Sequence, residues 1–365
     1  MPAAVSRVIV LLVVVLTMSV GLLSGCNDKS VDPPDDPDTL DPVVKDYPVY
    51  FCQPDLDERI YVFHPTSREI DSTDIPWRPV RGITVSADGK RLYLAQWASV
   101  IVVDTDSLGF IAELPYAPKT PVAVSPDNQL VAITGNDLHI LRTSDYSLIF
   151  SDTDRTVYGR FSADSRRFYC AAGWSPDKAG FVYKVDLSDS LLPVTRKAFQ
   201  NRGVTQVIPS PDESRWFMYQ SLPGNWAFAF EVYDVASDSI IFHDALVPGA
   251  GHMTMSPNGR YVFYTNPGLS AVDPLPVVQF TVYDVEANEL SQVITDKSFF
   301  VDSVSYKPPN TLTVTPDSRW LVALGGSMAL SVLYVYDIEG GEFVYREAYH
   351  YPAHWLIGPT VQVFE

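Results

Sequence analysis

The sequence predicts an all-β protein: a seven-bladed β-propeller built from four-stranded blades. A phrase of alternating small and apolar residues, a Ser/Thr-(Pro/Ala)-(Asp/Asn) turn and a second apolar run recurs six times. Between these turns the chain carries strand signals, with period-two alternation and turn residues. The two ends of the chain hold the parts of a seventh unit. Repeats of roughly 40 residues made of strands alone are typical of a radial array of blades.

Each complete unit predicts one blade. Its first apolar run is the inner strand, and the third run ends in a Tyr-Asp or Val-Asp pair in every unit but the second, which has Leu141-Arg142. The short acidic side chains are expected to cap the backbone of their own turns. The units begin at Val80–Gly89, Val122–Asn128, Gly159–Ser165, Val207–Ser214, Met253–Gly259 and Leu312–Ser318.

The seventh blade is expected to be composite. Tyr47–Pro76 contains three strand-like runs but lacks the Ser-Pro-Asp type of first strand. At the other end, Gly358–Phe364 resembles a first strand with no strand after it. Pairing the C-terminal strand with the N-terminal blade would remove two exposed sheet edges, which favour aggregation. The sequence therefore predicts a ring that is closed by the C-terminal strand.

The repeat resembles the YVTN-type family of seven-bladed propellers over about residues 46–365. The resemblance rests on Ser-Pro-Asp-Gly-like turns followed by Arg and then apolar residues, as in Ser86–Leu92, Ser256–Val262 and Thr315–Leu321. No unit carries Tyr-Val-Thr-Asn intact; the most similar segment is Tyr264-Thr265-Asn266. This family includes binding proteins, surface proteins, lactonases and large subunits of quinoprotein dehydrogenases, so the resemblance implies the fold and leaves the function open.

The N-terminus predicts a lipoprotein. Arg7 precedes the apolar run Val8–Leu16, and Leu23-Ser24-Gly25-Cys26 follows. A short apolar run with small residues after it is typical of a signal peptide. The last four residues resemble the bacterial lipobox, which implies cleavage before Cys26 and acylation with palmitate-type chains; an uncleaved membrane anchor is the alternative. Asn27 after the cysteine resembles the signal for the outer membrane, if the source is Gram-negative. We expect a lipid-anchored protein of the cell envelope, with its domain in the periplasm or outside the cell.

Residues 1–25 are thus interpreted as a signal peptide, 26–46 as the acylated cysteine and an acidic, Pro-rich tether, and 47–365 as the propeller. The tether has no periodic apolar face and is expected to be extended. The net charge of −18 disfavours nucleic acid as a partner. Expected partners are the membrane, through the lipid, and an unidentified protein or glycan.

No motif indicates a cofactor or a metal. The six histidines form no HExxH, HxH or CxxCH pattern, and no Gly-rich phosphate loop follows a strand. Cys52 and Cys170 fall in blades on nearly opposite sides of the ring, beyond the reach of a disulfide. We expect no cofactor and no metal, and both thiols are interpreted as small buried hydrophobes.

Aligned inner strands place one polar arc beside the ring axis. Arg160 aligns with Thr84 and Thr254 at the middle of the strands, and Tyr158, Gln206 and His252 stand two residues earlier in theirs. These four residues come from three adjacent blades. They are the candidate ligand-binding residues, because an Arg-Tyr-Gln-His arc can hold a carboxylate or a sugar-like ligand. The alternative is a channel in which polar side chains and water satisfy one another.

Three functional classes remain open. The first is a lipid-anchored binding or protein-interaction scaffold, which is the function we favour. The second is a lactonase-like hydrolase at a channel mouth, for which His252 with Arg160 is the candidate pair, although no carboxylate or metal is identifiable beside them. The third, a quinoprotein dehydrogenase subunit, lacks any cofactor-bearing feature. No catalytic residue is assigned.

Overall fold

In the computed structural model, the described residues are 47–52, 59–65, 67–74, 80, 82–172, 179–200, 202–221, 228–246, 252–265, 278–296, 311–327, 330–349 and 361–363. The chain divides into two units, Met1–Val44 and Lys45–Glu365, and the described residues all belong to the second. The predicted signal peptide, Cys26 and most of the tether lie outside the described residues.

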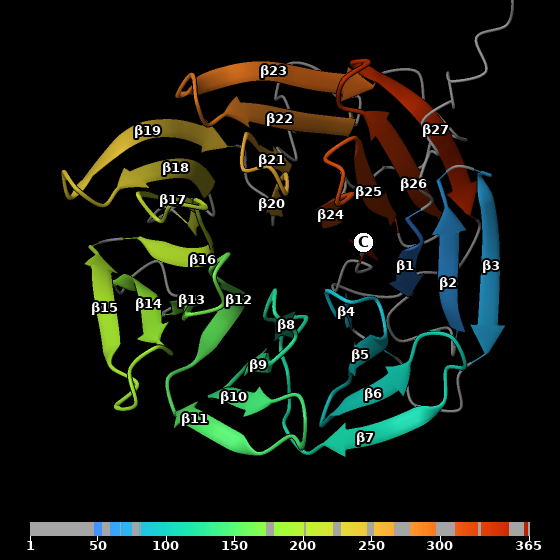
Figure 1. The fold of residues 1–365 in the computed structure, drawn as a ribbon. Helices are drawn as coiled ribbons and strands as arrows, with labels where there is room; N and C mark the ends of the chain where they lie inside the picture. The colour runs from blue at the N-terminus through green and yellow to red at the C-terminus, as the bar shows by residue number, and fades with distance from the viewer. Residues whose placement is uncertain are drawn as a thin grey trace, which may run out of the picture. The chain divides into compact units, whose positions relative to one another are not determined.

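The second unit is a ring of seven four-stranded antiparallel sheets, as predicted (Figure 1). The blades are numbered in chain order: blade 1 holds β28 and β1–β3, blade 2 β4–β7, blade 3 β8–β11, blade 4 β12–β15, blade 5 β16–β19, blade 6 β20–β23 and blade 7 β24–β27. The inner strands are β28 (Val361–Val363), β4 (Gly82–Val85), β8 (Ala123–Val124), β12 (Thr156–Phe161), β16 (Gly203–Pro209), β20 (Met253–Met255) and β24 (Thr311–Val314).

The remaining strands run outward from the axis in sequence order. The second strands are β1 (Val49–Cys52), β5 (Arg91–Ala95), β9 (Leu130–Thr134), β13 (Arg167–Ala172), β17 (Arg215–Ser221), β21 (Tyr261–Thr265) and β25 (Trp320–Ser327). The third strands are β2 (Arg59–His64), β6 (Val100–Asp104), β10 (Leu138–Arg142), β14 (Gly180–Asp186), β18 (Phe228–Asp234), β22 (Val278–Asp284) and β26 (Leu330–Asp337). The outer strands are β3 (Glu69–Asp74), β7 (Phe110–Leu114), β11 (Leu148–Asp152), β15 (Val194–Phe199), β19 (Ser239–Leu246), β23 (Glu289–Asp296) and β27 (Glu342–Tyr349).

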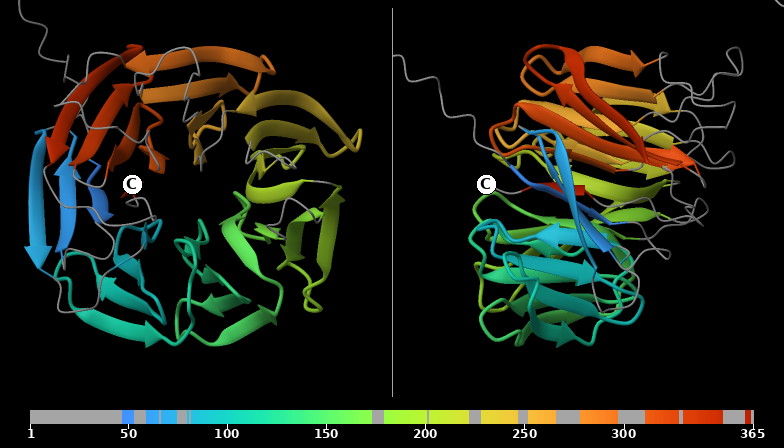
Figure 2. Two further views of the ribbon diagram at one scale, coloured as in Figure 1. Left: turned by 180° about the vertical axis from the view of Figure 1, so that it is seen from behind. Right: turned by 90° about the vertical axis from the view of Figure 1, so that its right-hand side faces the viewer.

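Blade 1 is composite. β28 pairs antiparallel with β1, with Val49 opposite Val363 and Phe51 opposite Val361. This pairing is consistent with closure of the ring by the C-terminal strand. Figure 2 shows the blades from behind and from the side, with the strands of neighbouring blades following one another around the ring.

The Ser-Pro-Asp turns are held by their own side chains, as the sequence predicted. In blade 2, Ser86 Oγ donates to Asp88 Oδ1 at 2.6 Å, and the backbone N–H of Arg91 donates to Ser86 Oγ at 2.9 Å. The same Ser/Thr-to-Asp/Asn bond is present in the other five units, at Ser125, Ser162, Ser210, Ser256 and Thr315. These bonds fix each turn locally, because a short side chain can replace a backbone partner.

The core lies between blades. Faces of adjacent sheets bury aromatic and branched side chains against each other; the cluster between blades 5 and 6, for example, contains Phe217, Phe230, Tyr264 and Tyr283. Phe230 and Tyr264 stack with ring centroids 4.2 Å apart. Because each blade packs only against its neighbours, stability is distributed around the ring.

The outer strands carry a repeated irregularity. The register between third and outer strands shifts in five blades, each time just before the Asp that ends the third strand or its equivalent, as between Val102 and Val103. A β-bulge at an edge twists the strand and discourages edge-to-edge pairing between molecules. The fold thus protects its exposed outer edges.

The two described cysteines, Cys52 and Cys170, are buried and form no disulfide. Burial is the main reason that the pKa of the Cys170 thiol is raised. Across the described ranges, no helix is long and apolar enough to cross a membrane.

Candidate functional site

A belt of hydrogen bonds links the inner strands of neighbouring blades. Thr84 Oγ1 donates to Val122 O at 2.7 Å between blades 2 and 3. The Tyr158 N–H donates to Thr120 Oγ1 at 3.4 Å between blades 3 and 4. Between blades 6 and 7, the Leu312 N–H donates to His252 Nδ1 at 3.4 Å. This belt fixes the positions of the inner strands and uses several of the polar groups near the axis.

Gln206 belongs to the belt. Its Nε2 donates to Met253 O at 2.9 Å and its Oε1 accepts from the Met253 N–H at 3.0 Å, joining blades 5 and 6. The side chain is 5 % exposed. Both ends of the amide therefore have backbone partners.

Tyr158 stands at a bulge in β12. The register with β13 runs from Val157 opposite Ala171 to Arg160 opposite Tyr169, so Tyr158 and Gly159 together oppose the single residue Cys170 and β12 carries one extra residue. Tyr158 has φ 42, in the left-handed region that a tyrosine seldom adopts. A bulge re-aims side chains and is frequent next to active sites. Here it places the Tyr158 ring edge-on to the His252 ring, with 5.8 Å between centroids.

Arg160 reaches across blade 5 to blade 6. Its Nη2 donates to Thr254 Oγ1 at 3.4 Å, a long and weak bond. Among the described residues, the Arg160 guanidinium has no other hydrogen-bond partner and forms no ion pair with a carboxylate. Burial lowers its pKa, yet an arginine stays charged at every physiological pH. The site therefore contains a positive charge that no described acid balances.

His252 is neutral in this environment. Burial, and then the nearby charge of Arg160, lower its pKa to about 3. Because Nδ1 accepts from the Leu312 N–H, the proton of the neutral ring lies on Nε2, a tautomer assigned from the hydrogen-bond network. Nε2 is then a donor with no partner among the described residues. His252 thus offers a hydrogen bond and is poorly suited to accept a proton.

We call Tyr158, Arg160 and His252 the axial site. The structure brings these three sequence-predicted residues together and assigns the fourth, Gln206, to the belt. Tyr158 is 37 % exposed, so the site is accessible, while surrounding protein raises the pKa of its phenol. Of the other aligned positions, the side chain of Gln362 lies outside the described residues, as does Cys26, the predicted lipidation site.

Sequence reasoning missed two residues that shape the axial site. Alignment of the inner strands places Thr254 level with Arg160 but predicts no contact between them; the hydrogen bond between the two joins blades 4 and 6. Gly159 is needed because a Cβ there would lie 2.0 Å from Phe168 Cζ. The one sequence signal for the bulge is the glycine between Tyr158 and Arg160, since a lone glycine in a strand often marks a bulge or a close approach.

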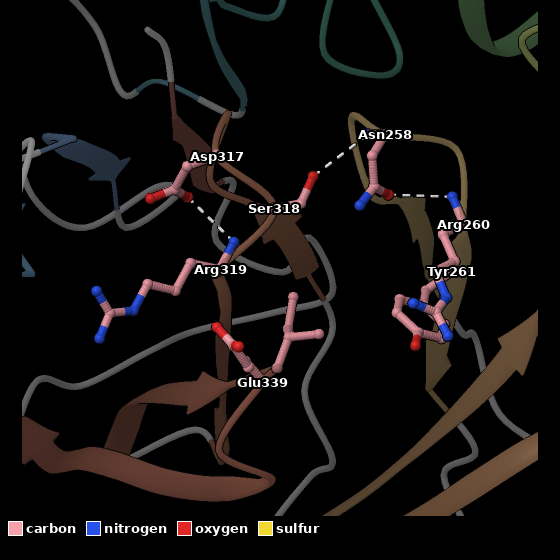
Figure 3. A pocket seen from close by; sticks show the side chains of 8 residues that line it. Asn258, Arg260, Tyr261, Asp317, Ser318, Arg319 and Glu339 are labelled. Atoms are coloured by element: carbon pink, nitrogen blue, oxygen red, sulfur yellow. Dashed lines mark hydrogen bonds between the residues drawn. The ribbon is translucent and has the colours of Figure 1, made fainter.

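A second candidate is a hollow of about 420 Å³ between blades 6 and 7 (Figure 3). Its polar side chains hold the local turns: Asn258 Oδ1 accepts from the Arg260 N–H at 3.0 Å and Asp317 Oδ1 from the Arg319 N–H at 3.0 Å. The Asn258 N–H donates to Ser318 Oγ at 3.2 Å and so joins the two turns. These polar groups hold the two turns and join blade 6 to blade 7. Their hydrogen bonds are accounted for without a ligand in the hollow. Nowhere in the described part of the chain do three or more His, Cys, Asp or Glu residues gather to hold a metal.

Comparison with known proteins supports the architecture. No family model and no curated protein matches the sequence. Among solved structures, a putative 6-phosphogluconolactonase from Bacteroides fragilis has a TM-score of 0.63 at 13% identity, covering 90% of this chain and 100% of that one. A putative 6-phosphogluconolactonase from Bacteroides uniformis has a TM-score of 0.62 at 13% identity, covering 87% and 100%. Kuenenia stuttgartiensis hydrazine synthase has a TM-score of 0.59 at 16% identity, covering 73% and 86%.

At these identities the likeness establishes the fold alone. A propeller fold is compatible with a binding scaffold and with a lactonase-like hydrolase, because function depends on the site that a fold carries. The choice between them therefore depends on the chemistry of the axial site.

Proposed function

We propose that the protein is a lipid-anchored binding protein of the bacterial cell envelope, acting outside the cytoplasm and holding a small ligand at the axial site. The observation that carries the proposal is the charge of Arg160, which no described acid balances, beside two further hydrogen-bonding side chains. Arg160 is partly buried, and a charge that is withdrawn from water without a partner costs stability. An anionic or hydrogen-bonding ligand would supply the missing partner of Arg160, and ligand binding would explain why the protein has an arginine at this position.

The anchor is the second part of the proposal. Acylation of Cys26 after cleavage of residues 1–25 would hold the propeller on a membrane through the tether, in the outer membrane if the source is Gram-negative. A protein or glycan partner would then meet a propeller fixed at the surface of the membrane.

The anchor is tested with a Cys26→Ser variant. We expect the wild type to incorporate labelled palmitate and to fractionate with membranes, and the variant to lose both properties. The matched control is Cys52→Ser, which changes a thiol of β1 and leaves the lipobox intact. Labelling that persists in Cys26→Ser would contradict the proposed lipidation site, and Cys52→Ser should be labelled like the wild type.

A lactonase-like hydrolase is the alternative function, and the names of two structural neighbours favour it. Hydrolysis of a lactone needs a group that activates water. His252 is a poor base, because its pKa is about 3 and Nδ1 already accepts a hydrogen bond. We therefore expect no turnover of 6-phosphogluconolactone above the spontaneous rate. Turnover that Arg160→Met and His252→Asn abolish would favour the hydrolase instead.

A further inference from the structure

We propose that the axial site binds a small carboxylate, with the carboxylate on Arg160 and hydrogen bonds from His252 and Tyr158. This inference rests on the proposed binding function and specifies its ligand. The sequence alone allows a carboxylate or a sugar-like molecule, and the hydrogen bonds of the structure distinguish the two.

The first step is charge. Within the part of the chain that the structure describes, Arg160 is bonded only to the neutral hydroxyl of Thr254. A guanidinium presents donors in a planar fork that matches a carboxylate, and such charge-assisted bonds are about twice as strong as neutral ones. An anion would neutralise Arg160 and occupy the donors that Thr254 leaves unused.

The second step is the balance of donors and acceptors. A polyol offers hydroxyl groups, which bind best to a site that mixes donors with acceptors. Two side-chain acceptors next to the axial site are already engaged by backbone N–H groups, Gln206 Oε1 by Met253 and His252 Nδ1 by Leu312. What remains is Arg160, the Nε2–H of His252 and the Tyr158 hydroxyl. A set dominated by donors suits the acceptor oxygens of a carboxylate.

The third step is preorganisation. The bulge and its left-handed Tyr158 are a strained conformation, which the protein maintains by packing Gly159 against Phe168. Strain of this kind gathers at ligand sites, because the surrounding structure holds a side chain where a ligand needs it. Tyr158 is therefore already placed beside His252 before a ligand arrives.

The experiment compares glycolate with ethylene glycol, in which a CH2OH group replaces the carboxylate. Binding of each probe to the full-length protein in detergent is followed by saturation-transfer NMR at millimolar concentrations. We expect glycolate to bind and ethylene glycol not to bind. Arg160→Met should weaken glycolate binding by about tenfold or more, in line with the strength of hydrogen bonds to charged groups. Arg160→Lys should retain part of the binding, because it keeps the charge and loses the fork.

The matched control is Arg166→Met, which removes an exposed arginine from the same blade and should leave glycolate binding unchanged. Equal binding of both probes would overturn the carboxylate inference while the binding function stands. Glycolate binding that survives Arg160→Met would place the anion elsewhere and overturn it as well. If neither probe binds the wild type, the inference is wrong; the lipid anchor is decided separately by the Cys26→Ser labelling.

Discussion

Gly159 lies so close to the ring of Phe168 that a Cβ at position 159 would be 2.0 Å from Phe168 Cζ. Phe168 is fully buried and packs against Phe161, with ring centroids 5.0 Å apart, so it cannot give way without disturbing the core between blades 3 and 4. This contact ties the bulge at Tyr158 to the core. The position of Tyr158 in the axial site is thus fixed by core packing as well as by hydrogen bonds.

Gly159→Ala should therefore damage both stability and ligand binding. We expect a loss of about 1–3 kcal/mol in the free energy of unfolding, typical of overpacking, and weaker binding of glycolate because Tyr158 moves. Phe168→Leu removes the ring atoms that clash with the added methyl group. The double variant should regain binding relative to Gly159→Ala, although Phe168→Leu alone is destabilising. Denaturant unfolding and NMR titration measure the two effects, and a double variant that binds no better than Gly159→Ala would contradict this role of the contact.

His252 should make stability depend on pH. Its pKa in the folded protein is about 3, below the ordinary 6.5, so the unfolded chain binds the proton more readily over this interval. The contribution of the neutral His252 to the free energy of unfolding is then fully present above about pH 6.5, and it is lost as the pH decreases toward 3. Between about pH 7 and pH 5 the contribution is at most about 2 kcal/mol. His252→Asn should lose less stability than the wild type over this range, as measured by urea unfolding at each pH. Parallel losses in both proteins would show that other groups cause the acid sensitivity.

Gln206 should matter for the ring and not for the ligand. Gln206→Leu leaves the N–H and C=O of Met253 without their partners, which we expect to cost about 1–3 kcal/mol. Gln220→Leu is the matched control, because Gln220 is fully buried and, among the described residues, its Oε1 has no partner and its Nε2 contacts only Met218 Sδ at 3.5 Å. The control should be neutral or stabilising. Glycolate affinity should stay the same in both variants. A loss of glycolate affinity in Gln206→Leu alone would show that Gln206 takes part in ligand binding.

The closure of the ring depends on the last few residues. Deleting 358–365 removes β28 and exposes the edge of β1, so the truncated protein should unfold at a lower temperature and aggregate more readily. Deleting only Phe364 and Glu365 leaves the three paired residues of β28 in place and serves as the control. Differential scanning calorimetry compares the three proteins. Equal melting temperatures would contradict closure by the C-terminal strand.

Hydrogen bonds from arginines of one blade to the next blade could be predicted from the sequence only in part. Three blades begin their second strand with an arginine that bonds to the next blade: Arg91 to Thr143 O at 2.8 Å, Arg167 to Glu213 Oε1 at 2.7 Å and Arg215 to Val285 O at 2.6 Å. Each of these arginines stands five residues after the Ser of its turn, so the three occupy equivalent positions of the repeat. Their acceptors come from a different blade, and two of them are backbone oxygens, which no side-chain pattern reveals.

The sequence by itself determined the blades, because their signals are local. Alternation specifies a strand, and a Ser-Pro-Asp turn is completed by bonds within five residues, such as that between Ser86 and Arg91. Candidate side chains near the axis followed from aligning these local units. The tertiary structure decided what those side chains do. Whether Gln206 is available to a ligand depends on Met253, 47 residues away, and the contact between Arg160 and Thr254 spans 94 residues. The alternation that placed Tyr158 and Arg160 on one face does not hold across the bulge, which the packing of Gly159 on Phe168 requires. Such relationships depend on how blades pack against each other, and packing between distant segments leaves no periodic signal in a single sequence.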